Sequence, residues 1–366
     1  MFQSIIIIVI YKMSRSNRIY LTLNYPAMTP GGKTLLTGIR GHDRVTYISG
    51  FYEPPEPNSI PISFIYKGNV RGQGTWNVLT YPSIIGRTVT GTFLYGPDIV
   101  NSEVNNQRSD ICGSVCGGNS DEIKVVGNYT TAETGSFQLG ALYQGSLNGL
   151  GRWTTLIPTL PGTVINTIAH STMGNIVVGN YEVEASNAEG KLGKAFIYDI
   201  RTKAYYDIIK PGAKSITAYG VWHNGDNSYT ICGGYSDLDP VSGIDTGYLV
   251  DWDNGTHTFS NWQSYSYNND RERSIITHFD GISSDGCDGY NLTGDKVTVG
   301  DLTPSAFFAH VTRRSNGQFE PNAYWEPISF SSLANTSGNS VFKSIVIGVY
   351  TIPPDPTVNG YISIPA

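Results

Sequence analysis

Short runs of β-branched and aromatic residues alternate with polar segments along the whole chain. The clearest stretch has four such runs, at residues 163–170, 175–182, 194–199 and 204–209. Each run is bounded by Gly, Pro, Asn or Ser, which is typical of strands joined by turns. The pattern predicts an all-β protein built from four-stranded units.

A repeated motif, apolar–Gly–x–Tyr, gives the period of these units. It reads SGFY at 49–52, VGNY at 126–129 and 178–181, GGY at 233–235 and IGVY at 347–350. A weaker copy is TGD at 293–295, which we align with Asp295 in the place of the tyrosine. The motif glycines then lie 77, 52, 54, 61 and 54 residues apart, which predicts six units with one insertion.

The sixth unit ends after its third run, at 359–365, and the missing fourth run lies at the other end of the chain. Residues 18–26 (RIYLTLNYP) resemble 75–82 (TWNVLTYP), a fourth run of the first unit. We therefore predict a six-bladed β-propeller of four-stranded antiparallel blades, with the ring closed by the N-terminal strand. A solenoid has the same periodicity, but a repeat split between the termini favours a closed ring. Four tryptophans should occupy equivalent fourth strands: Trp76, Trp153, Trp262 and Trp325.

We expect residues 14–366 to form this single propeller domain, with an insertion at 96–121 in blade 2. Residues 1–13 are either an N-terminal extension or a degenerate export signal, because the apolar run at 5–10 is too short to span a bilayer. The insertion carries Cys112 and Cys116, whose spacing suits half of a metal site or a redox pair. No second Cys or His pair lies nearby, which favours a small disulfide or two free thiols. Cys232 reads as a core thiol and Cys287 as an exposed, unpaired one.

Composition excludes several classes of protein. With 39% hydrophobic residues, the 366-residue chain is not intrinsically disordered. Its net charge of −6 argues against general affinity for nucleic acid, and we find no membrane-spanning segment.

The succession of Gly-x-Tyr, an aromatic–aliphatic pair and an outer strand followed by Pro-Gly resembles the extracellular HAF-type repeats of bacterial proteins. The best match is VVGNY…AFIYD…YYDIIKPGA at 177–213. The resemblance implies a secreted or surface-associated propeller, and it brings no assigned activity.

Two sets of polar residues are candidates for binding. The first set comes from the ends of the innermost strands, which converge on the central tunnel of a propeller and would meet a ligand there: His42, Tyr95, His170, His223, His278 and Asn335. The second set comes from acidic loops on one face and would hold a divalent cation, with calcium the candidate, or a basic partner: Glu182, Glu184, Asp237, Asp239, Asp245, Asp295 and Asp301. The alternatives are polar caps at a wet channel mouth and a solvated acidic rim.

No catalytic motif of a known class appears in the chain, and no catalytic residue is assigned. We therefore expect a non-enzymatic recognition or scaffold propeller, secreted or surface-displayed, that binds a protein or glycan partner through loops on one face. The alternative is a hydrolase or lyase acting on a glycan or small molecule at the central tunnel, with or without a metal.

Overall fold

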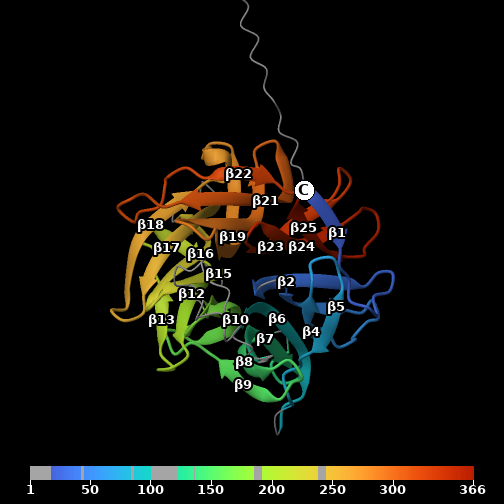
Figure 1. Ribbon diagram of the computed structural model, residues 1–366. Helices are drawn as coiled ribbons and strands as arrows, with labels where there is room; N and C mark the ends of the chain where they lie inside the picture. The colour runs from blue at the N-terminus through green and yellow to red at the C-terminus, as the bar shows by residue number, and fades with distance from the viewer. Residues whose placement is uncertain are drawn as a thin grey trace, which may run out of the picture.

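The computed structural model describes residues 18–42, 45–83, 86–99, 122–135, 137–184, 192–237 and 245–366. Viewed along its axis, the protein is a disc of small sheets arranged around a centre (Figure 1). The innermost strands β2, β6, β10, β15, β19 and β23 surround that centre (Figure 1). The predicted β-propeller of four-stranded antiparallel blades is confirmed.

Three sheets follow one another along the chain with the same simple order. The first contains β2 (Lys33–His42), β3 (Val45–Glu53), β4 (Ile62–Gly68) and β5 (Gly74–Val78). The second contains β6 (Val89–Ile99), β7 (Glu122–Thr131), β8 (Leu139–Ser146) and β9 (Gly151–Leu156). The third contains β10 (Val164–Met173), β11 (Ile176–Val183), β12 (Leu192–Asp199) and β13 (Tyr205–Ile208).

A nine-stranded sheet follows and consists of two antiparallel runs. One run has β14 (Ala213–Ile216) and β15 (Gly220–Gly225) end to end along the same edge of β16 (Ser228–Asp237), then β17 (Asp245–Asp253) and β18 (Thr258–Tyr265). The other has β19 (Ser274–Ser284), β20 (Gly289–Thr298), β21 (Asp301–Thr312) and β22 (Tyr324–Pro327). The two runs are joined by one parallel pair, Asp245 with Ile276. A short 3-10 helix, η2 (Tyr267–Asn269), lies between them.

The last sheet joins the two ends of the chain. It contains β23 (Asn335–Phe342), β24 (Ile345–Thr351), β25 (Asn359–Pro365) and the N-terminal strand β1 (Arg18–Thr22), which pairs antiparallel with β25. The Arg18 Nε donates to Glu326 Oε1 of β22 at 3.0 Å, so β1 also contacts the preceding sheet. The predicted split sheet is therefore present.

The apolar core lies between neighbouring sheets. One buried cluster joins Ile48 and Phe64 of the first sheet to Ile347 and Ile362 of the last, which closes the ring. The four tryptophans lie on β5, β9, β18 and β22, half-buried against such clusters, as predicted. Burying apolar faces between sheets explains why single short sheets are stable here.

The motif glycines permit the innermost strands to lie close to the second strands. A Cβ on Gly127 would lie 1.9 Å from the Phe93 carbonyl oxygen, and one on Gly294 would lie 1.7 Å from that of His278. No side chain fits at such distances, so glycine is required by close backbone approach.

Register corrects one alignment made from sequence. Gly294 pairs with Phe279 and Asp295 pairs with His278, as Gly179 and Asn180 pair with the corresponding residues of β10. Asp295 therefore occupies the variable position of the motif, and Lys296 stands where the tyrosine was expected. The Cys112 and Cys116 segment and residues 1–13 lie outside the described residues, so those predictions stay open. Cys232 is buried and Cys287 exposed, and neither forms a disulfide.

Candidate active site at the propeller axis

Each innermost strand has a β-bulge opposite the Gly-x-Tyr motif of its neighbour. Register shifts occur between Leu36 and Gly38 in β2, and between Phe279 and Gly281 in β19, with equivalents in β6, β10 and β23. In the fourth unit the extra residue lies in the break between β14 and β15. Together the bulged residues form what we call the axial ring: Thr37, Tyr95, His170, Tyr219, Asp280 and Asn339.

All members of the axial ring share one burial pattern. Each is partly buried and stands between two buried chain neighbours, such as Phe279 and Gly281 around Asp280. A bulge adds one residue to a strand and re-aims its side chain, which is why bulges occur beside active sites. The innermost strands lie around the centre of the disc (Figure 1), so the ring residues are the side chains that the fold presents at the axis.

Aromatic side chains form one side of the ring, and each contacts the next. The ring centroids of Tyr95 and His170 are 5.0 Å apart, those of His170 and Tyr219 are 4.2 Å apart, and those of Tyr219 and His278 are 4.4 Å apart. Burial lowers the pKa of His170 to about 3, with a smaller contribution from His278. His170 is therefore neutral at physiological pH.

An acid–base group lies next to this aromatic arc, on β19. His278 Nδ1 is 2.9 Å from Asp280 Oδ1, and its Nε2 is 2.8 Å from Thr217 Oγ1. Burial alone would lower the pKa of His278, but the nearby carboxylates of Asp280, Asp245 and Asp295 outweigh it and raise the pKa. The imidazole thus holds Asp280 in place through one nitrogen while the other is anchored on Thr217.

Asp295 is the second carboxyl group of this site, and its environment differs from that of Asp280. Its Oδ1 accepts a hydrogen bond from the Gly338 amide at 3.0 Å, and its Oδ2 accepts one from Ser337 Oγ at 2.6 Å. Burial, followed by the charge of Asp280, raises the pKa of Asp295 to about 6. A carboxyl group that keeps its proton up to a pH of about 6, close to a second carboxyl group, is the arrangement of an acid–base pair.

A third carboxyl group, Asp245, stands at the start of β17 and is half-buried. Burial raises its pKa, and the charge of His278 opposes that effect. The side chains of Asp245, Asp280 and Asp295 all act electrostatically on His278, so the group has three carboxyl groups around one imidazole.

Arg40 of β2 contacts β15, an innermost strand of the fourth unit. This buried side chain of β2 donates through Nη2 to the Val221 carbonyl oxygen of β15 at 3.1 Å, and its guanidinium lies over the Trp222 ring. Both Arg40 and Asp280 act electrostatically on Cys232, so Arg40 and the acid–base group lie near each other. Lys124 and Asp98 form a buried ion pair at 3.1 Å in the same region.

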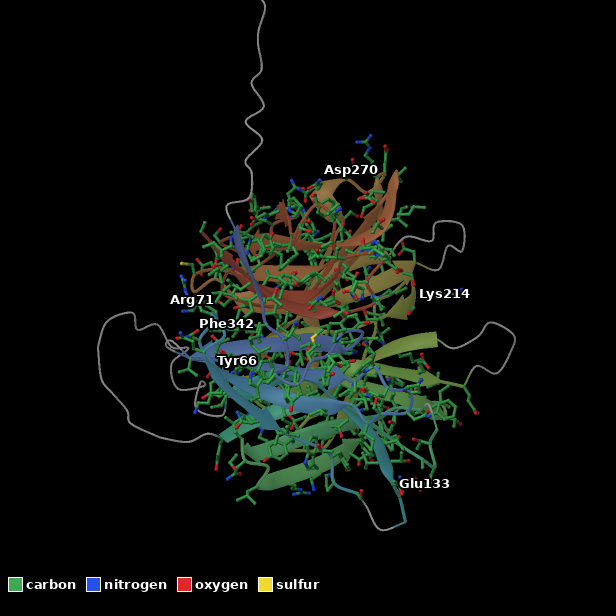
Figure 2. All side chains as sticks on the ribbon, turned by 90° about the vertical axis from the view of Figure 1, so that its right-hand side faces the viewer. Tyr66, Arg71, Glu133, Lys214, Asp270 and Phe342 are labelled. Carbon is green, nitrogen blue, oxygen red and sulfur yellow. The ribbon has the colours of Figure 1, made fainter. Side chains whose placement is uncertain are left out.

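The two faces of the disc therefore differ. Figure 2 shows the disc edge-on, with Arg71 and Phe342 toward one face and Lys214 and Glu133 toward the other. The innermost strands begin on the side of Lys214, which we call the entry face, and end on the side of Phe342, which we call the exit face. Arg40 lies three residues beyond the bulge of β2, toward the exit face.

Some residues of the first set predicted from sequence belong to the axial ring or contact it. Tyr95 and His170 are members, and His278 touches both Tyr219 and Asp280. His223 is buried near the exit end of β15, where its Nε2 is 3.0 Å from the Asp226 carbonyl oxygen, and Asn335 is exposed at the start of β23. The backbone of His42 ends β2, beyond Arg40.

The ring members that were not predicted from the sequence share a sequence pattern with the others. Every member is followed by Gly or Ser, as in Thr37–Gly38, Tyr95–Gly96 and Asp280–Gly281. The reason is close packing of neighbouring innermost strands: a Cβ on Gly38 would lie 2.7 Å from the Tyr95 carbonyl oxygen. A small residue after a polar one, repeated at the unit period, could have identified the ring.

Two residues of the second set, Asp245 and Asp295, lie around His278 at the axis, and the other residues of the set that the structure describes do not gather with them. Glu182 accepts a hydrogen bond from Asn166, Asp237 pairs with Arg271 at 3.1 Å, and Asp301 bonds to the Thr303 amide. Glu184 is exposed at the end of β11, and Asp239 lies outside the described residues. Within the described ranges no group of three or more His, Cys, Asp or Glu side chains is arranged to hold a metal ion.

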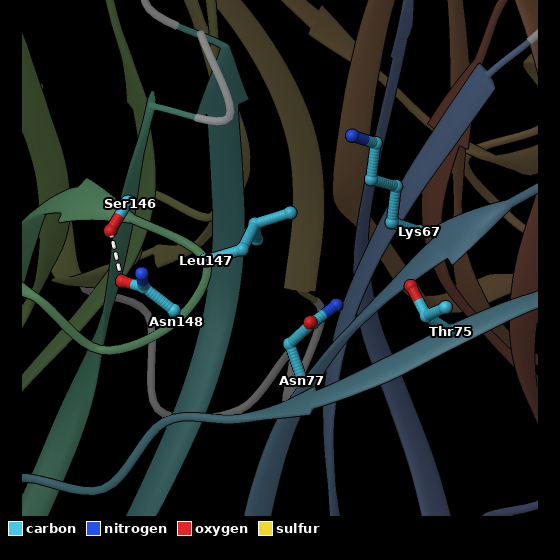
Figure 3. Close-up of a pocket in the computed structure, with 6 residues that line it drawn as sticks. All are labelled: Lys67, Thr75, Asn77, Ser146, Leu147 and Asn148. Carbon is cyan, nitrogen blue, oxygen red and sulfur yellow. Dashed lines mark hydrogen bonds between the residues drawn. The ribbon is translucent and has the colours of Figure 1, made fainter.

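A surface pocket of about 210 Å³ lies away from the axis, between the outer strands of the first two sheets (Figure 3). It is lined by Lys67, Thr75, Asn77, Ser146, Leu147 and Asn148. These side chains include no carboxyl group or histidine, so the pocket lacks an acid–base pair. The part of the chain that the structure describes has no helix suited to cross a membrane.

No family model and no curated protein matches this chain, so the resemblance to HAF-type repeats stays a prediction. Solved structures do resemble it. An α-L-arabinofuranosidase from Fusarium graminearum in complex with an iminosugar inhibitor is 13% identical, with a TM-score of 0.46 over 90% of this chain and 92% of that one. A protein named glycoside hydrolase is 8% identical, with a TM-score of 0.45 over 87% and 93%. YCF48 from Cyanidioschyzon merolae is 10% identical, with a TM-score of 0.37 over 90% and 82%.

These structures correct our expectation of a non-enzymatic scaffold. That expectation rests on a regular repeat scaffold without a recognisable catalytic motif. The solved structures that resemble this chain include a glycoside hydrolase and an α-L-arabinofuranosidase, which does not agree with that expectation. At these identities the likeness concerns the fold, and any activity has to be argued from the site itself.

Proposed function

We propose that this protein is a glycan hydrolase whose active site is the acid–base group at the axial ring. The observation that carries the proposal is the pair of carboxyl groups Asp280 and Asp295, which both act on His278 but have different environments: Asp280 is hydrogen-bonded to His278, and Asp295 pairs with it in register. Hydrolysis of a glycosidic bond requires such a pair, one protonated and one ionised.

The roles follow from the surroundings of each group. Asp295, protonated up to a pH of about 6, donates its proton to the leaving oxygen as the glycosidic C–O bond breaks. Asp280 supplies the carboxylate on the other side, as base for the attacking water or as nucleophile at the anomeric carbon. His278 is a positioning residue, because it fixes Asp280 through Nδ1 and is itself held by Thr217. Tyr95 and Tyr219 offer aromatic faces on which a sugar ring can stack.

The proposal includes a six-bladed count. Two antiparallel runs, one of five strands in which β14 and β15 share the innermost place and one of four strands, are connected by a single parallel pair and are better understood as two blades than as one sheet. With the four other sheets, this gives six blades, in agreement with the repeat period of the sequence.

The test is release of reducing sugar from a panel of plant and microbial polysaccharides by the purified protein. We expect Asp295→Asn and Asp280→Asn each to lower kcat by roughly a hundredfold or more, as expected for removal of a general acid or its partner. Asp288→Asn is the matched control, because Asp288 is exposed in the turn between the same two strands, β19 and β20. If both variants keep the rate of the wild type, the assignment is wrong. The anomer first released, followed by NMR, distinguishes base from nucleophile for Asp280.

A further inference from the structure

Among the described residues, three arginine side chains are withdrawn from solvent, and two of them have a carboxylate partner. The side chain of Arg18 is 4% exposed and contacts Glu326 at 3.0 Å. Arg313, which directly follows β21, donates to both carboxylate oxygens of Asp251, at 2.6 and 2.8 Å. Arg40 is 6% exposed, and no residue that the structure describes forms an ion pair with it. Arg40 is therefore a buried positive charge without the partner that the other two have.

The guanidinium of Arg40 uses only part of its hydrogen-bonding capacity. Its Nη1 donates to the Ile39 carbonyl oxygen at 2.9 Å, and its Nη2 donates to that of Val221 at 3.1 Å. Its Nε is buried and has no hydrogen-bond partner. A guanidinium carries five N–H groups in a rigid fork, so the two bonds leave three of them without an acceptor in the described part of the chain.

The carboxyl groups of this region are engaged elsewhere. Asp98, whose charge acts on Arg40, contacts Lys124 Nζ at 3.1 Å and accepts a hydrogen bond from the Gly174 amide at 3.2 Å. Asp280 is held by His278 at 2.9 Å. Because the charges of Asp98 and Lys124 offset each other, one positive charge is left over at Arg40.

Arg40 cannot relieve this situation by losing its proton. Burial lowers the pKa of Arg40, but a guanidinium stays charged in proteins. A buried charge is costly unless an opposite charge compensates it. The Trp222 ring, whose centroid lies 5.7 Å from Arg40 Cζ, offers only the partial negative charge of its π face. The free N–H groups thus require a negatively charged acceptor.

We propose that Arg40 anchors a binding site for a small monovalent anion, of which chloride is the simplest, between β2 and β15. These two innermost strands lie on opposite sides of the centre of the disc, so the site is near the axis (Figure 1). One negative charge matches the one uncompensated positive charge, whereas a divalent anion would leave a net charge buried. The ion has to be small, because Ile39 and Val221 beside the guanidinium are fully buried. The inference is independent of the proposed function.

The first measurement is a series of thermal melts in which sodium chloride replaces sodium gluconate at constant ionic strength. Chloride should raise the melting temperature of the wild type by a few degrees and then saturate, because an ion that binds only the folded state stabilises it. Sodium nitrate and sodium formate should act like chloride, and sodium sulfate should not. In Arg40→Gln the chloride shift should disappear.

Arg18→Gln is the matched control, because it also removes a buried arginine charge. It should melt lower than the wild type in every salt, since Glu326 loses its partner, and it should keep the full chloride shift.

The second measurement locates the ion in the wild type and needs no variant. Crystals soaked in sodium bromide should give an anomalous difference peak within hydrogen-bonding reach of Arg40 Nε. A wild type without a chloride shift and without a bromide peak at Arg40 would overturn the proposal. An equal chloride shift in folded Arg40→Gln would also overturn it, because the ion would then bind elsewhere. An Arg40-dependent shift that is larger with sulfate than with chloride would overturn the monovalent class.

Discussion

Replacing Asp295 by Asn should raise the stability of the protein at neutral pH while it removes activity. Folding raises the pKa of this carboxyl group from its ordinary value of 3.8 to about 6. The folded state therefore holds its proton more tightly than the unfolded chain does. The contribution of this group to the free energy of unfolding is fully present below pH 3.8. It is lost as the pH rises toward 6, because Asp295 is harder to ionise in the folded state than in the unfolded chain.

The size of the effect follows from the same values. The difference of about two between the pKa of Asp295 in the folded protein and in the unfolded chain lowers the free energy of unfolding by about 3 kcal/mol above pH 6. Asparagine carries no charge, so it avoids this cost at every pH. It also keeps the local hydrogen bonds: its Oδ1 can accept from the Gly338 amide, and its Nδ2 can donate to Ser337 Oγ.

The assay is a series of thermal melts of wild type and Asp295→Asn between pH 4 and pH 8. Only the difference between the two proteins is used, since other groups titrate equally in both. We expect the variant to melt a few degrees higher at pH 8 and at the same temperature near pH 4. A variant that melts lower than the wild type at pH 8 would refute the reasoning, because the buried charge would then be stabilising. A stability cost at a catalytic residue is the usual trade-off between stability and activity.

Other predictions concern the pH profile, the ring closure and the motif glycines. Hydrolysis should fall as the pH rises through about 6, since Asp295 must be protonated, and a pH–rate curve that stays flat to pH 8 would exclude it as the acid. Deleting residues 14–26 should lower the melting temperature by many degrees, because β25 loses its partner and an unpaired edge is exposed, whereas deleting residues 1–12 should change nothing. Gly127→Ala should destabilise by roughly 3 kcal/mol or more through its contact with Phe93, against about 1 kcal/mol for Gly135→Ala in an open turn, measured by urea unfolding.

The strand pattern and the repeat could be predicted from the sequence because both are local properties. Alternating apolar runs bounded by turn residues define a strand wherever it ends up, and every predicted run from 163 to 209 is a strand of the third sheet. The partner of β1 could also be predicted, because the fourth run was missing at one end of the chain and present at the other. The two cysteine environments, Cys232 and Cys287, followed from composition around each residue.

The site could not be predicted in the same way, because it depends on register and on distant neighbours. A bulge adds one residue to an innermost strand, so counting from strand ends leads to His42 and Asn335 instead of Thr37 and Asn339. The acidity of Asp295 is decided by burial and by Asp280, and its hydrogen bonds come from Ser337 and Gly338 of another sheet, 42 and 43 residues away. The sequence by itself determined which residues form strands and how often the unit repeats, since those depend on neighbours along the chain. Only the tertiary structure decided which polar side chains meet at the axis and which of their carboxyl groups keeps a proton, since burial and charge act through space.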